Sequence, residues 1–111
     1  MNKIIAFLII SISLFFSSNA QNIKLQGSII DKNDNKKLSG VTVALLNNAD
    51  SSNLKFAITN NEGIFEFTNL NEGNFIIKAS IIGYKTFIQT INTSLTKSND
   101  IGNISLEKSS S

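Results

Sequence analysis

The sequence predicts an all-β protein, a seven-stranded antiparallel β-sandwich that follows a cleaved signal peptide. Short runs of alternating apolar and polar residues recur at near-regular spacing, which is typical of strands with one buried face. Gly, Asn and Asp, which favour turns, separate these runs. After the first 20 residues no window sustains the i, i+3, i+4, i+7 apolar spacing of a helix, and this combination favours a sandwich.

Residues 1–20 are expected to be the signal peptide. Lys3 gives a positive n-region, residues 4–16 are an apolar run broken only by serines, and Ser18 and Ala20 are the small residues that signal peptidase reads. The apolar run is shorter than the roughly 20 residues of a transmembrane helix, which disfavours a membrane anchor. We therefore expect cleavage after Ala20.

The chain that remains would be one small domain, residues 21–107, with a polar tail at 108–111 and no membrane span. It carries 9 Lys against 8 acidic residues, and only Lys36 and Lys37 are adjacent. Nucleic-acid binding requires clustered cations and is therefore excluded. The chain has no Cys, which excludes a lipid-bearing N-terminal cysteine and favours a bacterial envelope over a eukaryotic extracellular space.

The first three strands are predicted from alternation in the first half of the domain. Residues 23–30 alternate, Val41, Val43 and Leu45 share one face of a second strand, and residues 54–59 form a third run. Polar loops rich in Asn and Asp, residues 31–37 and 47–53, connect them. The inward positions of the first two strands are Ile23, Leu25, Gly27, Ile29, Val41, Val43 and Leu45.

The stretch 59–77 holds the fourth and fifth strands, residues 64–67 and 74–80. Gly63 and Gly73 lie where the chain turns, since glycine adopts positive φ without steric cost. Side chains two apart on a strand share a face. The inward aromatic and aliphatic residues of these strands are Phe65, Phe67, Phe75 and Ile77.

A turn at Gly83 and Tyr84 precedes a sixth strand at 85–91, and a polar loop at 93–100 precedes a seventh at 101–106. The predicted core consists of Leu25, Ile29, Val41, Val43, Leu45, Phe56, Ile58, Phe65, Phe67, Leu70, Phe75, Ile77, Ile88, Ile104 and Leu106.

Residues that could perform catalysis are scarce. The absence of His and Cys excludes Ser-His-Asp and Cys-His catalysis and removes the preferred zinc ligands. Glu62 and Glu72 lie in predicted turns, and Glu66 alternates out of phase with the phenylalanines, so a solvated face is favoured over a catalytic carboxylate pair. We predict no enzyme activity, no catalytic residue, no cofactor and no metal.

Two further patterns have a structural and a functional interpretation. Residues 31–35 place oxygen donors at alternate positions, as a calcium loop does, but Lys36 and Thr42 replace the Gly and Glu of an EF-hand, which favours plain turns. The candidate ligand or partner contacts are Tyr84 and Phe87, which with Ile82 are the apolar residues expected to be exposed. Tyr84 could stack on a sugar or a partner protein, or close one end of the sandwich with its hydroxyl at the rim.

A set of short motifs extends from Leu25 to Leu106. It comprises Gly27, residues 38–43, residues 59–67, Leu70, Gly73, Phe75 and residues 82–84. In these motifs the chain resembles the carboxypeptidase regulatory-like domain, which implies a Greek-key sandwich of prealbumin-like (transthyretin-like) topology without catalytic residues of its own. It is similar in particular to the version that follows the signal peptide of TonB-dependent outer-membrane receptors. Since the sequence ends at Ser111, where a plug would be expected, it is either a free-standing module or the front of a truncated gene.

Two functions are consistent with these observations. The first is a non-catalytic module, exported to the periplasm or associated with the outer membrane, that docks a protein partner of the envelope through strand edges and loops. The alternative is a small carbohydrate-binding protein of the envelope, with Tyr84, Phe87 and nearby Asn residues as its platform for a polysaccharide.

Overall fold

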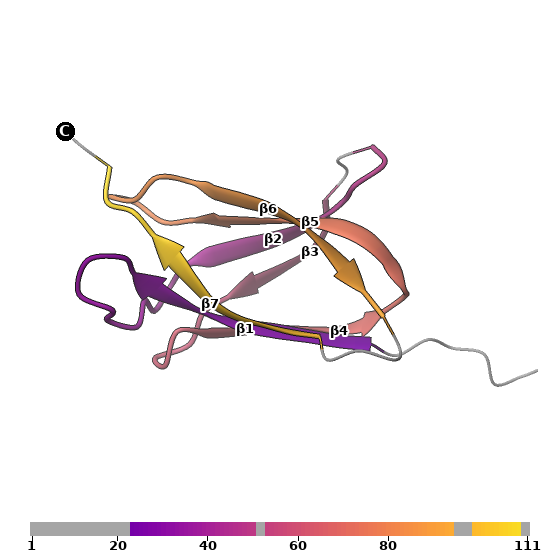
Figure 1. Ribbon diagram of the computed structural model, residues 1–111, viewed down its shortest axis with the longest axis horizontal. Coiled ribbons are helices and arrows are strands. Elements are labelled where there is room, and N and C mark those ends of the chain that lie inside the picture. Colours follow the sequence, from indigo (N-terminus) through magenta and orange to yellow (C-terminus); the bar gives the residue numbers. More distant parts are fainter. Residues whose placement is uncertain (1–22, 51–52, 95–98, 110–111) are drawn as a thin grey trace, which may run out of the picture.

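The computed structural model describes residues 23–50, 53–94 and 99–109, so the predicted signal peptide at 1–20 lies outside the described residues. The described residues form seven strands in two sheets (Figure 1). The strands are β1 (Ile23–Asp31), β2 (Thr42–Asn47), β3 (Asn53–Ile58), β4 (Ile64–Leu70), β5 (Gly73–Ser80), β6 (Phe87–Thr93) and β7 (Asp100–Leu106). This confirms the predicted all-β sandwich. Within this part of the chain no helix is long and apolar enough to cross a membrane.

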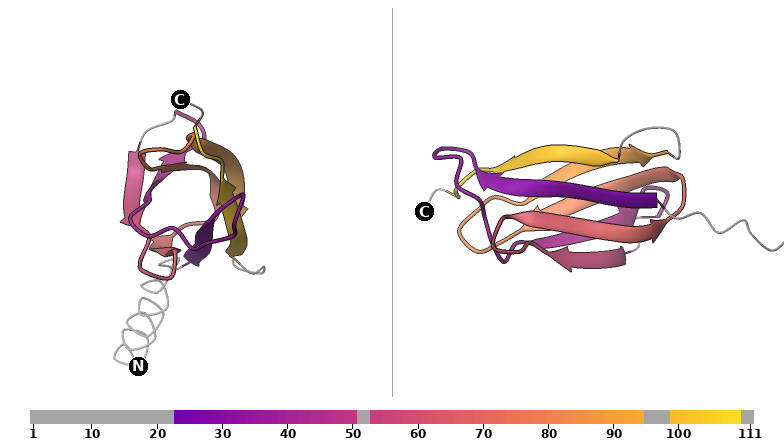
Figure 2. Two further views of the ribbon diagram at one scale, coloured as in Figure 1. Left: turned by 90° about the vertical axis from the view of Figure 1, so that its left-hand side faces the viewer. Right: turned by 90° about the horizontal axis from the view of Figure 1, so that it is seen from below.

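The two sheets face each other around a common interior, which the end-on view in Figure 2 shows. One sheet has three strands in the order β4-β1-β7, and the other has four in the order β3-β2-β5-β6. The hairpins β2–β3 and β5–β6 both lie in the four-stranded sheet, where β2 also pairs with β5. The three-stranded sheet is instead assembled from strands that are distant in sequence.

One pairing departs from the predicted antiparallel arrangement. β1 pairs antiparallel with β4 but parallel with β7, whereas the other described ladders are antiparallel. Alternation along a strand indicates which face is buried, and it carries no information on the direction of a neighbour. The direction of β7 depends on how the chain crosses from β6 back to the other sheet.

The interior is an apolar core to which both sheets contribute. Most of the predicted core residues are buried, and Ile23, Ala79 and Ile91 join them. Phe65 and Phe67 of β4 are 1% and 3% exposed, and their rings meet edge to face with centroids 6.0 Å apart. Such aromatic pairs contribute beyond their buried area. The inward face of β4 is therefore the one that the alternation predicted.

Three predicted core residues are wrong. Phe56, Ile58 and Ile88 are 63%, 68% and 64% exposed. In β6 large apolar residues occur at both parities, so alternation does not select a face, whereas in β3 Phe56 and Ile58 share one parity and only the small Ala57 holds the other. The register with the central strands determines which face points outward. Phe56 pairs with Ala44, and Ile88 pairs with Lys78, on the outward side of β2 and β5.

Gly27 lies on the inward face of β1 opposite Phe65. A Cβ at this position would lie 2.8 Å from Phe65 Cζ and 2.8 Å from Ile101 Cγ1. Both contacts are shorter than packed atoms allow, so the missing side chain gives space to the larger neighbours. This glycine is needed for packing.

Gly63 is needed for the turn into β4. Its φ is +74°, and a Cβ would lie 2.7 Å from the backbone oxygen of Ile29. The Asn60 side chain accepts hydrogen bonds from the backbone N–H groups of Glu62 (2.9 Å) and Ile64 (3.0 Å), which closes the turn. The predicted turn at Gly63 is confirmed, with Asn60 as its cap.

Candidate functional site

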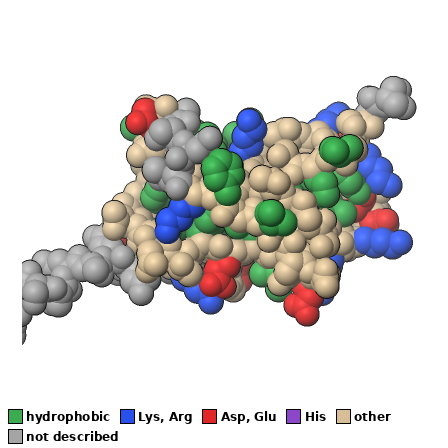
Figure 3. Space-filling view, turned by 180° about the vertical axis from the view of Figure 1, so that it is seen from behind, with side chains coloured by type: hydrophobic (Ala, Val, Ile, Leu, Met, Phe, Trp, Pro, Cys, Tyr) green, Lys and Arg blue, Asp and Glu red, His purple; other side chains and the backbone are tan. Residues whose placement is uncertain are grey.

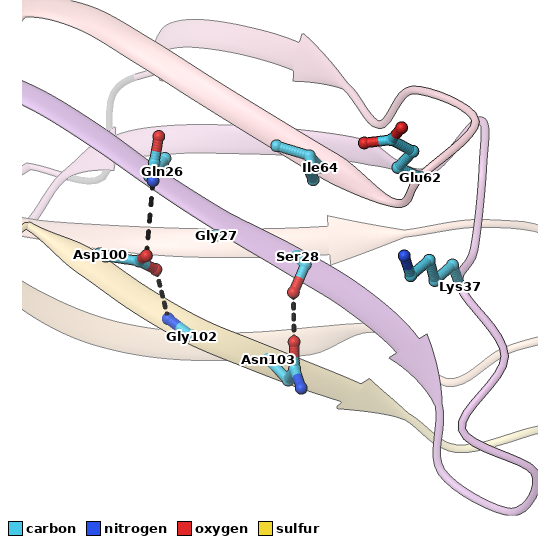
Figure 4. Close-up of a pocket in the computed structure, with 9 residues that line it drawn as sticks. All are labelled: Gln26, Gly27, Ser28, Lys37, Glu62, Ile64, Asp100, Gly102 and Asn103. Carbon is cyan, nitrogen blue, oxygen red and sulfur yellow. Dashed lines mark hydrogen bonds between the residues drawn. The ribbon is translucent and has the colours of Figure 1, made fainter.

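A shallow groove of about 340 Å³ lies on the outer face of the three-stranded sheet (Figure 4). It is lined by Gln26, Gly27, Ser28, Lys37, Glu62, Ile64, Asp100, Gly102 and Asn103. The outward residues of β1 face those of β7 across it, and Lys37 and Glu62 lie at one end (Figure 4).

The polar groups of this groove bond largely to one another. Gln26 Nε2 donates to Asp100 Oδ2 (3.4 Å), Ser28 Oγ donates to Asn103 Oδ1, and the backbone N–H of Gly102 donates to Asp100 Oδ1 (2.9 Å). These bonds form a polar ladder on an open surface. Such a surface can hydrogen-bond a polar ligand, but it lacks the desolvated cleft that perturbs catalytic carboxylates.

Asp31 is the buried carboxylate of the structure, with 2% of its surface exposed. Its Oδ2 accepts a hydrogen bond from the Tyr84 hydroxyl (2.6 Å), and Lys108 Nζ lies 3.9 Å from the same oxygen. Its Oδ1 accepts hydrogen bonds from the backbone N–H groups of Asn33 (2.7 Å) and Asp34 (3.4 Å). A buried charge held in this way is satisfied by donors from three parts of the chain.

The pKa values of the two side chains move apart. The Tyr84 hydrogen bond, followed by the bond from Asn33, lowers the pKa of Asp31 below its ordinary 3.8. The same bond, with burial, raises the pKa of Tyr84 to about 12. The hydrogen bond stabilises the charged carboxylate of Asp31 together with the neutral phenol of Tyr84. Near neutral pH neither group changes its protonation state, so the pair has a structural role and is not an acid–base pair.

The Asn- and Asp-rich loop after β1 is organised as turns. Asp31 caps it as described, and Asp34 Oδ1 accepts a bond from the backbone N–H of Lys36 (2.9 Å). These contacts direct carboxylate oxygens at backbone donors, as in Asx turns. Over the described ranges no three acidic, His or Cys side chains gather as a metal-binding group.

The residues after β7 are paired with the turn before β6. Tyr84 and Lys108 form a β-bridge, Lys85 N donates to Glu107 O (2.8 Å), and Ser109 N donates to Gly83 O (3.0 Å). The start of the segment predicted to be a polar tail therefore helps to hold Tyr84 against Asp31.

The candidate contact residues have different environments. Ile82 is fully exposed, whereas Tyr84 and Phe87 are half-buried and pack against the core. Tyr84 closes one end of the sandwich with its hydroxyl bonded, which is the structural interpretation of that residue. A role of Tyr84 and Phe87 in ligand or partner contact stays a prediction.

Most of the exposed large apolar residues lie elsewhere, on the outer face of the four-stranded sheet and toward its two borders. Phe56 and Ile58 of β3 and Ile88 of β6 point to this side, and Ile82 follows β5 at its end. Lys78 of β5 lies between Ala44 and Ile88 in the register of the sheet. The view from behind, which is opposite to the side of β6 in Figure 1, shows separate hydrophobic side chains among polar and basic ones, with acidic side chains toward the margins (Figure 3).

This outer face was missed by sequence reasoning because its members were assigned to the core. In β6 large apolar residues occur at both parities, whereas in β3 the alternation itself favours an inward face for Phe56 and Ile58. Only the register with β2 and β5 separates the inward from the outward ones.

The model of the CarboxypepD_reg-like domain family matches residues 25–111 of the chain. No curated protein matches the chain.

Among solved structures, the major pilin subunit of Bacillus cereus is similar, with a TM-score of 0.63 and 14% identity over 80% of this chain. The group B streptococcus pilus 2b backbone protein has a TM-score of 0.58 and 17% identity over 77% of this chain. A DUF3823 family protein from Parabacteroides merdae has a TM-score of 0.51 and 14% identity over 81%. The matched regions cover 31%, 40% and 47% of those chains, respectively, so this chain spans less than half of each. At these identities the likeness concerns the fold.

Proposed function

The chain belongs to the CarboxypepD_reg-like domain family, and from this premise we propose that it is a non-catalytic module, exported to the bacterial envelope, that docks a protein partner. The outer face of the four-stranded sheet carries the proposal. Several large apolar side chains exposed on one face of a sheet favour an interaction surface there. Phe56 and Ile58 on border strand β3 and Ile88 on border strand β6 are each more than half exposed on this face, and Ile82, just after β5, is fully exposed.

The proposed export of the module and its proposed cellular location rest on the sequence. Residues 1–20 carry the n-region, apolar run and small residues of a signal peptide. Two of the similar structures are described as a pilus backbone protein and a pilin subunit. We place the module in the periplasm or at the outer membrane and relate it to the N-terminal extension of TonB-dependent receptors, on the motifs between Leu25 and Leu106.

Photo-cross-linking in the native host tests docking. A photoreactive amino acid at Phe56 should give a discrete cross-linked product that excess purified chain removes by competition. The matched control is Glu66, which is exposed on the outer face of the other sheet. Equal, non-competed products at both positions would contradict a specific docking face.

The carbohydrate-binding alternative has one observation in its favour, the polar ladder of the groove in Figure 4. Its amide, hydroxyl and carboxylate groups suit sugar hydroxyls, although no aromatic platform lines it. Calorimetric titration with polysaccharides, together with Tyr84 fluorescence, separates the two functions. Saturable binding that Asn103→Ala abolishes, with no cross-link from Phe56, would favour the carbohydrate-binding protein.

A further inference from the structure

β6 borders the four-stranded sheet and pairs on one side only. Its ladder with β5 runs from Gly73↔Thr93 to Ala79↔Phe87 without a register shift, whereas the ladders β1–β4, β1–β7 and β2–β3 each contain one. A regular border strand presents the N–H and C=O groups of alternate residues to any further strand. The other edge of β6 is therefore a straight row of backbone donors and acceptors.

The centre of β6 is exposed on both faces. Ile88 and Thr90 point to the outer face, but Gln89, which shares the parity of the half-buried Phe87 and the buried Ile91, is also exposed. In a covered strand one of two consecutive residues is buried. Three consecutive exposed residues show that neither sheet covers the middle of this strand.

The other border strands are less accessible to a further strand, because β3 and β4 are linked to each other and β7 is irregular. On the opposite side of the sandwich, Lys55 Nζ of β3 donates to Thr68 O of β4 (2.5 Å), which links the two borders. β7 contains Gly102 at φ +72° beside a register shift, and such bulges protect an edge.

β6 lacks the usual protective devices. Its sequence, FIQTINT, contains no Lys, Pro, Gly or acid, although charges, proline and bulges are what protein edges generally use against pairing. Figure 1 shows β6 and β7 on the near side of the molecule, in different sheets. In the described part of the chain no backbone hydrogen bond joins them.

We propose that the free edge of β6 is where the partner docks, by adding an extended segment as a fifth strand of the sheet. This inference rests on the proposed function and specifies its binding mode. Residues of the segment that share the side of Ile88 extend the apolar outer face, and an acidic residue among them reaches toward Lys78. Lys78 is the one charged side chain on that face among the described residues.

Charge favours a partner protein over a second copy. In a pairing of two β6 strands, each would bring Ile88, Thr90 and Asn92 to the outer face. None of these supplies a carboxylate to Lys78, so such a dimer would have one uncompensated cation on each side of the seam. A partner segment whose outward-facing positions hold both β-branched residues and an acidic residue meets both requirements.

Hydrogen–deuterium exchange on the full chain tests the proposal with synthetic peptides of strand length. The probes are a peptide with Val and one Glu at the positions of one face and Thr at the other positions (Val/Glu), the same peptide with Lys in place of Glu (Val/Lys), and the Val/Glu peptide with a Pro next to the Glu. We expect the Val/Glu peptide to slow exchange at alternate amides of β6 and not of β7, and the Pro peptide to have no effect. We expect Val/Glu to bind about two- to fivefold more tightly than Val/Lys, as one exposed ion pair allows.

Charge-reversal variants distinguish binding at the edge of β6, next to Lys78, from a general electrostatic attraction of the peptides. Lys78→Glu should reverse the preference between the Val/Glu and Val/Lys peptides, whereas Lys32→Glu, in the loop after β1, should leave it unchanged. Failure of every peptide to protect β6, or an unchanged preference in Lys78→Glu, would overturn the proposal. Protection of β6 that rises with protein concentration alone would overturn it in favour of a second copy. Cross-linking from Phe56 does not depend on β6. If no peptide protects β6 but a partner is still cross-linked at Phe56, the proposed docking function stands and only strand addition at the edge of β6 is refuted.

Discussion

At the scale of single residues, Asp31 and Tyr84 join parts of the chain that are 53 positions apart. The buried carboxylate is surrounded by donors from its own loop, from Tyr84 and from Lys108. Neither residue type nor spacing predicts this contact, because it depends on how the end of β1 meets the turn before β6. The sequence did indicate that the Tyr84 hydroxyl could lie at the rim.

The titration of Tyr84 tests the pair directly. Tyr84 is the one tyrosine of the chain, so its phenolate absorbance reports this residue alone. We expect a native pKa of about 12 against the ordinary 10.0, and a return toward 10.0 in Asp31→Asn. A native pKa near 10.0 would show that the hydrogen bond does not form in solution.

The same pair predicts how stability depends on pH. Tyr84 holds its proton more tightly when folded, so its contribution is complete below about pH 10 and is lost as the pH rises toward about 12. The pKa of Asp31 is lowered, so its contribution is present above about pH 4 and is lost as the pH falls through its folded pKa. Denaturant melts should therefore show Tyr84→Phe as less stable than the natural chain at neutral pH, with the gap narrowing at both extremes. If the difference in unfolding free energy between the natural chain and Tyr84→Phe did not change with pH, Tyr84 would stabilise the fold through packing and not through the bond to Asp31.

Gly27 gives a second prediction for a single position. Gly27→Ala should cost about 1–3 kcal/mol in unfolding free energy, because its methyl group would overlap Phe65 and Ile101. Combining it with Phe65→Leu should restore part of the loss, since the two positions are in contact. Gln26→Ala, on the outward face, is the control and should cost less than about 1 kcal/mol. Equal costs at the two positions would refute the packing argument.

At the scale of elements, the sequence predicted the strands better than their faces. β1, β2, β4, β5 and β7 have their large apolar residues mainly at one parity, and their inward faces were predicted correctly. β6 is a border strand with large apolar residues at both parities, and in the border strand β3 the large residues Phe56 and Ile58 share the parity that faces outward. The faces of both strands follow from the register with β2 and β5. For the same reason the outer face and the free edge of β6, which carry the proposals, were not visible in the sequence.

Phe65, which points into the core, and Phe56, which points to solvent, test which face of each strand is buried. Phe65→Ala should cost about 3–5 kcal/mol, the usual range for a buried aromatic, because Phe65 is 1% exposed. Phe56→Ala should cost less than about 1 kcal/mol, because that side chain is 63% exposed. Urea melts of both variants are sufficient. The reverse order would mean that the faces are exchanged.

At the scale of the whole molecule, the sandwich has two outer faces of different chemistry. The three-stranded sheet presents a polar ladder whose groups bond to one another. The four-stranded sheet presents exposed apolar side chains on its border strands β3 and β6, with Lys78 on β5 between them. A solvated polar face keeps a small domain soluble, whereas an apolar face is retained where it is covered in function. This asymmetry is the physical basis for assigning docking to the four-stranded sheet.

The measurement that tests this claim most directly is a competition experiment on the product cross-linked from Phe56. Purified natural chain is added in excess and compared with a Phe56→Thr, Ile58→Thr, Ile88→Thr variant whose urea melt shows that it is folded. We expect the natural chain to abolish the product and the folded variant to leave it unchanged. A variant that competes as well as the natural chain would show that the partner is bound elsewhere, and would contradict docking through this face.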